Sequence, residues 1–149
     1  MRTLIIICSA IITLMGSAQA GATDYQCMQG HKSTPYQRLK ITLRGKVVQK
    51  ITYENELGQQ EGGAWFGCTV SASRGDEQIS WSLEDQNQRL RFKDKDAEGT
   101  SILIKDEPTS IIIAFEGSDR YFCGANSALP KKIVLEKKTR TCNFYGPDL

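Results

Sequence analysis

The chain has 149 residues, of which 40% are hydrophobic and 24% are charged, enough apolar material for one globular domain. Its 19 basic and 17 acidic residues give a formal net charge of +2. Because the two signs are nearly balanced and interspersed, the composition gives no indication of a nucleic-acid-binding surface or of attachment to an anionic membrane.

The first twenty residues are typical of a cleaved export signal. Arg2 supplies the positive charge, Leu4–Leu14 the apolar run and Ala18-Gln19-Ala20 a small-residue cleavage site. The apolar run is too short for a membrane-spanning helix. We therefore expect residues 1–20 to be removed, and Gly21–Leu149 to form a single β domain that is exported and soluble, without membrane insertion.

Cysteine usage agrees with an exported domain. Loss of the leader removes Cys8 and leaves an even number of cysteines: Cys27, Cys68, Cys123 and Cys142. Four cysteines in such a domain are typical of two disulfides, for which three pairings exist. We favour Cys27–Cys68 and Cys123–Cys142, which tie neighbouring parts of the chain. No CxxC pair occurs and His31 is the only histidine, so we expect no metal, no cofactor and no thiol nucleophile.

The first strong strand signal is a hairpin. Two alternating runs, Leu39–Arg44 and Val47–Glu54, are joined by Gly45-Lys46, which predicts two antiparallel strands with a two-residue turn. The alternation places Val47 and Gln49 on the same face as Ile51 and Tyr53. The stretch Asn55–Gly63 is polar and contains three glycines, and we expect a mobile loop there.

Strand patterns continue to the end of the chain. They cover Ile79–Glu84, a short run with Leu90 and Phe92 after the turn Asp85-Gln86-Asn87, Thr100–Lys105, Ser110–Glu116, Ile133–Leu135 and Thr141–Tyr145. Strand starts recur about every ten residues and no long stretch has a helical period, which predicts an all-β fold. We expect an antiparallel β-sandwich or flattened barrel of about eight strands, stapled by disulfides. An exposed edge strand would permit a homodimer.

Two features that resemble catalytic or metal sites are interpreted as ordinary structure. His31 lies in the polar stretch Gln29–Thr34 without a partner pattern, which favours a surface residue. Asp94–Gly99 matches the first half of a calcium loop, but Lys105 stands where the bidentate glutamate belongs, which favours a charged turn between strands. We therefore expect a binding protein rather than an enzyme, with no catalytic residues.

The polar loop Ser118-Asp119-Arg120-Tyr121 is the candidate binding site. It lies between the apolar run Ser110–Glu116 and Cys123, so it should be rigid and lose little conformational entropy on docking. Tyrosine and arginine are also frequent interface hot spots. If Phe122 enters the core beside Cys123, Tyr121 points outward.

This loop resembles the S-G-x-Y loop of the bacterial periplasmic lysozyme inhibitors, most closely the inhibitors of invertebrate-type (i-type) lysozyme. The resemblance implies a periplasmic all-β protein that inserts the loop into the lysozyme cleft, where the hydroxyls of Ser118 and Tyr121 meet the catalytic carboxylates. Asp119 stands where the family has glycine, and its charge should repel those carboxylates unless a neighbouring cation such as Arg120 pairs with it. Alternatively, Gly117 supplies the flexible position.

Other interpretations stay open. An exported immunity protein that neutralises another cell-wall or membrane-targeting toxin would share the leader, the disulfides and the absence of catalytic groups. A small β-barrel that binds an apolar ligand would need a lined cavity, whereas a filled core is indicated by the bulky inward set Ile51, Ile79, Trp81, Leu83, Ile113 and Phe115. The residues Gly117–Asp119 would otherwise form an ordinary hairpin turn.

Overall fold

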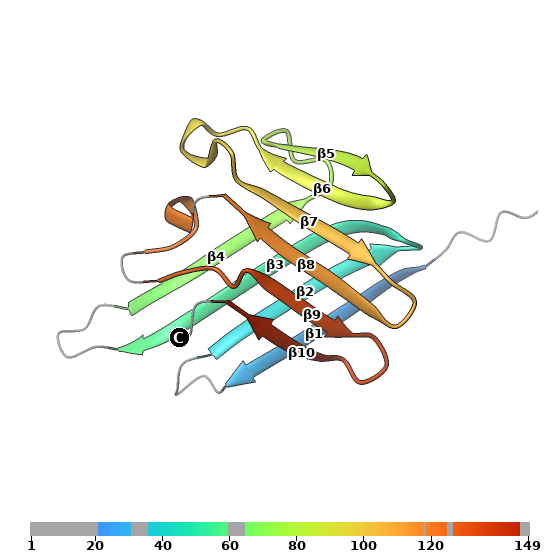
Figure 1. Ribbon diagram of the computed structural model, residues 1–149, viewed down its shortest axis with the longest axis horizontal. Coiled ribbons are helices and arrows are strands. Elements are labelled where there is room, and N and C mark those ends of the chain that lie inside the picture. Colours follow the sequence, from blue (N-terminus) through green and yellow to red (C-terminus); the bar gives the residue numbers. More distant parts are fainter. Residues whose placement is uncertain (1–20, 31–35, 60–64, 118, 125–126, 147–149) are drawn as a thin grey trace, which may run out of the picture.

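The computed structural model describes residues 21–30, 36–59, 65–117, 119–124 and 127–146 (Figure 1). Within these residues ten strands form two antiparallel sheets, and the sheets do not close into a barrel. This confirms the predicted all-β sandwich, with ten strands instead of about eight. The expected export signal at residues 1–20 and His31 lie outside the described residues.

Each sheet is a meander in which every strand pairs with the next one along the chain. The four-stranded sheet contains β1 (Ala22–Gly30), β2 (Tyr36–Arg44), β3 (Val47–Gln59) and β4 (Trp65–Ser73). The six-stranded sheet contains β5 (Ile79–Glu84), β6 (Asn87–Phe92), β7 (Ser101–Asp106), β8 (Ser110–Glu116), β9 (Lys132–Glu136) and β10 (Thr141–Tyr145). Two short 3-10 helices, η1 (Lys95–Ala97) and η2 (Asp119–Tyr121), follow β6 and β8. No helix in the described part of the chain is long and apolar enough to cross a bilayer.

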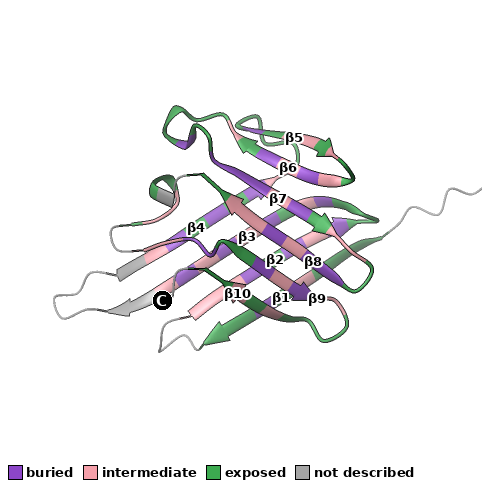
Figure 2. Ribbon diagram, viewed as in Figure 1, coloured by how far each residue is buried: buried purple, intermediate pink, exposed green. Residues whose placement is uncertain are grey.

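The core lies between the two sheets, which cross face to face, and its buried residues alternate along the strands (Figure 2). Tyr53 of β3 is fully buried, with its ring centroid 5.5 Å from that of Phe115 and 6.3 Å from that of Phe144. Its hydroxyl donates to Oε1 of Gln37 at 2.8 Å, so the buried oxygen is satisfied. Burial of one large apolar side chain stabilises a fold by about 1.5–3 kcal/mol.

The β2–β3 hairpin turns at Gly45-Lys46 as predicted, but the face predicted for the start of β3 is wrong. Thr42 pairs with Lys50 and Leu43 with Val48, so Gln49 is an extra residue in β3. Because of this extra residue, the side chains of β3 before the bulge point to the face opposite to the one that the alternation after the bulge predicts. Val48 is consequently fully buried, whereas Val47 is 44% exposed.

Two other expectations are corrected. The segment Asn55–Gly63 is not all loop, because β3 continues through Gln59, and Asn55 is only 5% exposed. Leu83, expected in the core, is 73% exposed. It lies near the C-terminal end of β5, an edge strand, where the opposite sheet does not cover the inner face.

The favoured disulfide pairing is also wrong, although all four cysteines are oxidised. The bonds are Cys27–Cys142, between β1 and β10, and Cys68–Cys123, between β4 and the segment after η2. In a sandwich of two meanders, residues close in sequence lie in the same sheet, whereas residues that face each other across the core are remote in sequence. The bonded cysteines are accordingly 115 and 55 residues apart.

Candidate functional site

The candidate loop lies at the end of the six-stranded sheet where η1 and η2 are found (Figure 1). Asp119 begins η2, and Arg120 and Tyr121 follow with exposed side chains. Ser118 lies outside the described residues, as does the side chain of Asp119. Arg120 and Tyr121 are therefore the members of the predicted site that the structure places at the surface.

The chain enters this loop through a position that only glycine fits. Gly117 has φ of +101°, and a Cβ atom added there would lie 2.5 Å from the carbonyl oxygen of Gly99 and 2.7 Å from Cα of Thr100. A side chain would thus meet backbone atoms, which cannot move aside cheaply. Gly117 therefore has a left-handed backbone conformation, packed against Gly99 and Thr100, immediately before the loop.

The chain leaves the loop through a second fixed point, on the edge of the four-stranded sheet. Cys123 is bonded to Cys68 of β4, and the two residues also form an isolated β-bridge. On either side of the bridge, the N–H of Thr69 donates to the carbonyl of Phe122 at 2.9 Å, and the N–H of Gly124 donates to the carbonyl of Gly67 at 3.1 Å. The disulfide is therefore embedded in backbone pairing on both sides.

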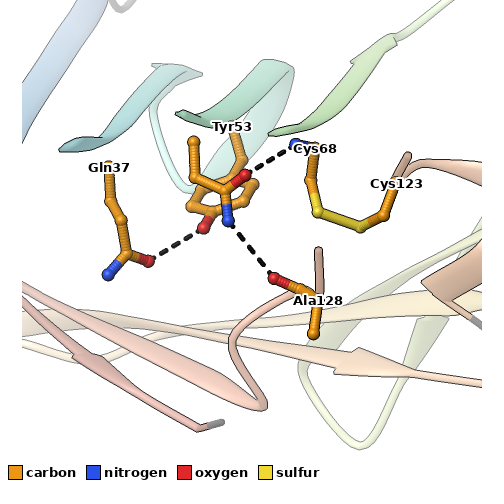
Figure 3. The surroundings of a disulfide bond; sticks show 6 residues. Gln37, Tyr53, Cys68, Cys123 and Ala128 are labelled. Carbon is orange, nitrogen blue, oxygen red and sulfur yellow. Dashed lines mark hydrogen bonds between the residues drawn. A yellow bond between two sulfur atoms is a disulfide. The ribbon is translucent and has the colours of Figure 1, made fainter. Parts of the chain in front are cut away.

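A buried amide extends this second fixed point (Figure 3). Oδ1 of Asn55 accepts a hydrogen bond from the N–H of Cys68 at 2.6 Å, and its Nδ2 donates to the carbonyl of Ala128 at 3.2 Å. Asn55 thus links β3, β4 and the chain beyond the loop. Sequence reasoning missed it, because an asparagine in a polar, glycine-containing stretch gives no signal of burial.

The ring of Tyr121 packs in a cluster with the rings of Phe92 and Phe122. The ring centroid of Phe122 lies 4.7 Å from that of Phe92 and 4.8 Å from that of Tyr121, in edge-to-face contacts. Phe122 packs against the core, while Tyr121 is 40% exposed, which are the orientations expected from the sequence. Edge-to-face pairs contribute about 0.5–1.5 kcal/mol each beyond their burial, so the ring of Tyr121 is held in place.

The hydroxyl of Tyr121 is directed at the connection between β6 and β7. It donates to Oδ2 of Asp94 at 3.3 Å, while Oδ1 of Asp94 accepts from the N–H of Asp96 at 2.9 Å and caps η1. Partial burial of the phenol and then the charge of Asp94 raise the pKa of Tyr121 above its usual value. The Asp94–Gly99 segment connects strands, as predicted, but nothing in the sequence indicated its contact with Tyr121.

Beside this contact lies a surface hollow of about 530 Å³ lined by Phe92, Asp94, Gly99 and Thr100 among others. Among the described residues, no three His, Cys, Asp or Glu side chains converge as metal ligands would. Chemically, the arrangement offers a fixed aromatic ring with a hydroxyl donor and an adjacent cation, the pattern of a binding surface.

The class defined by these observations is a disulfide-bonded two-sheet β-sandwich that exposes Arg120 and Tyr121 at its surface. Comparisons with protein-family models, with characterised proteins and with solved structures found no match.

Proposed function

We propose that this protein is an exported, periplasmic lysozyme inhibitor, with i-type lysozyme as the favoured partner. The loop Ser118–Tyr121 would enter the active-site cleft and block it without chemistry of its own. The observation that carries the proposal concerns the two ends of this loop: Gly117 lies close against the backbone of Gly99 and Thr100, and the Cys68–Cys123 disulfide follows Tyr121. A loop that is already ordered loses little entropy on binding.

The chemistry of the exposed side chains supports the same proposal. Lysozymes hold two carboxyl groups about 5–9 Å apart on either side of the scissile bond. A hydroxyl that donates to an ionised carboxylate forms a charge-assisted hydrogen bond, stronger than a neutral one. Tyr121 already makes a bond of this type to Asp94. Arg120, exposed beside it, would add a positive charge to an acidic cleft.

The direct test is cell-wall lysis by i-type, chicken-type and goose-type lysozymes, with and without the purified oxidised protein. We expect inhibition of the i-type enzyme at near-stoichiometric concentration. Inhibition of another type alone would keep the mechanism and correct the partner. If no lysozyme is inhibited, the proposal fails, and an immunity protein directed at a different cell-wall or membrane-targeting toxin becomes the explanation to test.

A further inference from the structure

A second hollow, of about 570 Å³, lies at the opposite end of β6 from the loop, where the β2–β3 and β5–β6 hairpins meet. Its volume is within the range of small-molecule sites. Residues from four segments line it: Lys46 and Val47 where β3 begins, Arg74 after β4, Trp81, Ser82 and Leu83 of β5, and Gln86 and Gln88 around the start of β6. The β-bulge at Gln49 and the uncovered end of β5 direct Val47 and Leu83 to this position.

The floor of this hollow is pre-organised by a buried amide. Gln88 is 7% exposed; its Oε1 accepts from the N–H of Val48 at 2.8 Å, and its Nε2 donates to the carbonyl of Lys46 at 2.8 Å. Arg74 donates from Nη2 to the same Oε1 at 3.3 Å and from Nε to the carbonyl of Val48 at 3.1 Å. These bonds fix the guanidinium 4.5 Å above the ring of Trp81, in cation–π contact.

The walls are apolar and open to solvent. Leu83 is 73% exposed and Val47 is 44% exposed, and both line the hollow together with the partly buried ring of Trp81. Contiguous exposed apolar side chains with a rim of polar groups are typical of ligand or partner sites. The hollow therefore offers an apolar surface together with a positioned cation.

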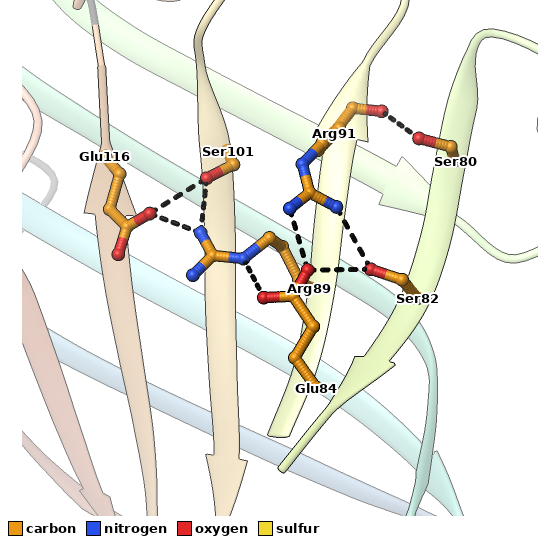
Figure 4. Close-up of polar contacts among 7 residues, drawn as sticks. All are labelled: Ser80, Ser82, Glu84, Arg89, Arg91, Ser101 and Glu116. Atoms are coloured by element: carbon orange, nitrogen blue, oxygen red, sulfur yellow. Dashed lines mark hydrogen bonds and ion pairs between the residues drawn. The ribbon is translucent and has the colours of Figure 1, made fainter. Parts of the chain in front are cut away.

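The two charged residues that line this hollow, Lys46 and Arg74, are both cations with donors that have no partner among the described residues. Nη1 of Arg74 and the ammonium of Lys46 make no hydrogen bond there, and the buried Nε1 of Trp81 has no acceptor. No carboxylate lines the hollow. Glu84, next to Leu83, lies on the other face of β5 and is bonded to Arg89 and Arg91 (Figure 4). A ligand with an anionic acceptor group would complement these cations.

We propose that this hollow binds an amphiphilic carboxylate. The apolar body of the ligand packs on Val47, Trp81 and Leu83, and its carboxylate accepts hydrogen bonds from Arg74 and Lys46. A carboxylate suits the planar guanidinium, which donates to it in a bidentate manner. The site is separate from the lysozyme-binding loop and does not depend on the function proposed for that loop.

The test uses three probes with the same eight-carbon chain: octanoate, 1-octanol and octyltrimethylammonium. Each is titrated into ¹⁵N-labelled protein while the indole N–H of Trp81 and the backbone N–H signals of Val47 and Leu83 are followed. We expect saturable shifts with octanoate, at least about tenfold weaker binding of octanol, and no binding of the cation, because octanol lacks the charge-assisted hydrogen bonds and the cation is repelled by Arg74 and Lys46. Equal affinity for octanol and octanoate, shifts elsewhere on the surface, or no binding of octanoate each overturn the proposal.

Variants separate the site from a nonspecific surface effect. Arg74→Gln should weaken octanoate binding about tenfold, but Arg74 also bonds to Val48 and could affect folding. Leu83→Ser and Lys46→Gln change exposed side chains that the fold does not need, and each should weaken binding. Lys50→Gln changes another exposed lysine, which lies on β3 outside the hollow; it is the matched control and should bind octanoate normally. Unchanged affinity in both Leu83→Ser and Lys46→Gln contradicts the proposal.

Discussion

The hydroxyl of Tyr121 donates a hydrogen bond to the carboxylate of Asp94, with 3.3 Å between the two oxygens. A phenol has a single proton to donate. If that proton is to reach a carboxylate of lysozyme, the bond to Asp94 must first be broken. If Tyr121 binds a lysozyme as proposed, Asp94 has two opposite effects: it orients the phenol before binding, and it competes with the enzyme for the same donor.

The hydroxyl itself is tested by Tyr121→Phe. The ring contacts with Phe92 and Phe122 remain, so the melting temperature should be nearly unchanged. Loss of a charge-assisted hydrogen bond should raise the inhibition constant about tenfold or more. Tyr145→Phe, which removes the hydroxyl of another half-exposed tyrosine on β10, is the control in the lysis assay. Equal inhibition by both variants would exclude the Tyr121 hydroxyl from the mechanism.

Competition by Asp94 is tested by Asp94→Asn. The amide keeps an oxygen to cap η1 through the N–H of Asp96, but its NH₂ group cannot accept the phenol proton. We expect a several-fold lower inhibition constant, because the proton no longer has to leave a charged acceptor. Combination with Tyr121→Phe should cancel the gain. A weaker inhibitor would instead mean that orientation by Asp94 outweighs competition.

The sequence was sufficient for the fold class because its evidence is local. Period-two alternation and short polar turns predicted most of the strands, and the bounds of Ser110–Glu116 and Thr141–Tyr145 were predicted as the structure has them. The outward Tyr121 and inward Phe122 followed from the same alternation. Properties set by neighbours in the chain were thus accessible without the structure.

Properties set by contacts between the sheets were not accessible. The disulfide partners depend on which strands form the edges of each sheet, and the contacts of Asn55 and Asp94 join segments remote in sequence. The bulge at Gln49 has no recognisable sequence signal. The alternation therefore placed Val47, instead of Val48, on the buried face of β3. The disulfides and these contacts are long-range arrangements, and the bulge is an irregularity of strand pairing; alternation within a strand encodes neither.

Rigidity at the entry to the loop is tested by Gly117→Ala, with Gly75→Ala as the matched control. Both glycines have strongly positive φ, +101° and +95°, but a Cβ atom at Gly75 would meet nothing within 4 Å. Gly75→Ala should therefore lower the free energy of unfolding only through backbone strain, by about 1–2 kcal/mol. Gly117→Ala should lower the free energy of unfolding by a further ~1–3 kcal/mol, because the added Cβ atom overlaps the backbone of Gly99 and Thr100. Chemical denaturation measures the difference, and equal losses would show that the loop entry is not tightly packed.

Acid should destabilise the protein through the ion pairs on the outer face of the six-stranded sheet. Hydrogen bonds from Arg89 and then Arg91 lower the pKa of Glu84 from 4.5 to about 2, and Arg89 also lowers the pKa of Glu116. Because folding lowers these values, the unfolded state binds more protons at acidic pH. The contribution to stability is complete above pH 4.5 and is lost as the pH falls through about 2.

The measurement is the free energy of unfolding in urea from neutral pH down to about pH 2. Glu84→Gln should lose less stability over this range than the unmodified protein, because the variant has no Glu84 carboxylate to protonate. Glu77→Gln, at an exposed glutamate outside the ion pairs of the described residues, should follow the unmodified protein. An identical pH profile for Glu84→Gln and the unmodified protein would contradict the assignment.

The two disulfides should differ in their effect on inhibition more than in their effect on stability. Paired serine substitution at Cys27 and Cys142, or at Cys68 and Cys123, opens loops of 115 and 55 residues. Chain entropy then predicts losses of about 5 and about 4 kcal/mol, which are upper values because native strain and residual structure reduce them. By melting temperature alone the two variants should therefore look similar.

Inhibition separates them, because only Cys68–Cys123 holds the end of the Arg120–Tyr121 segment. At a temperature where both variants are folded, the Cys68/Cys123 variant should inhibit at least about tenfold more weakly, since the loop must be ordered again on binding. The Cys27/Cys142 variant should inhibit normally. If both variants lose inhibition in proportion to stability, the loop is not specifically pre-organised by its disulfide.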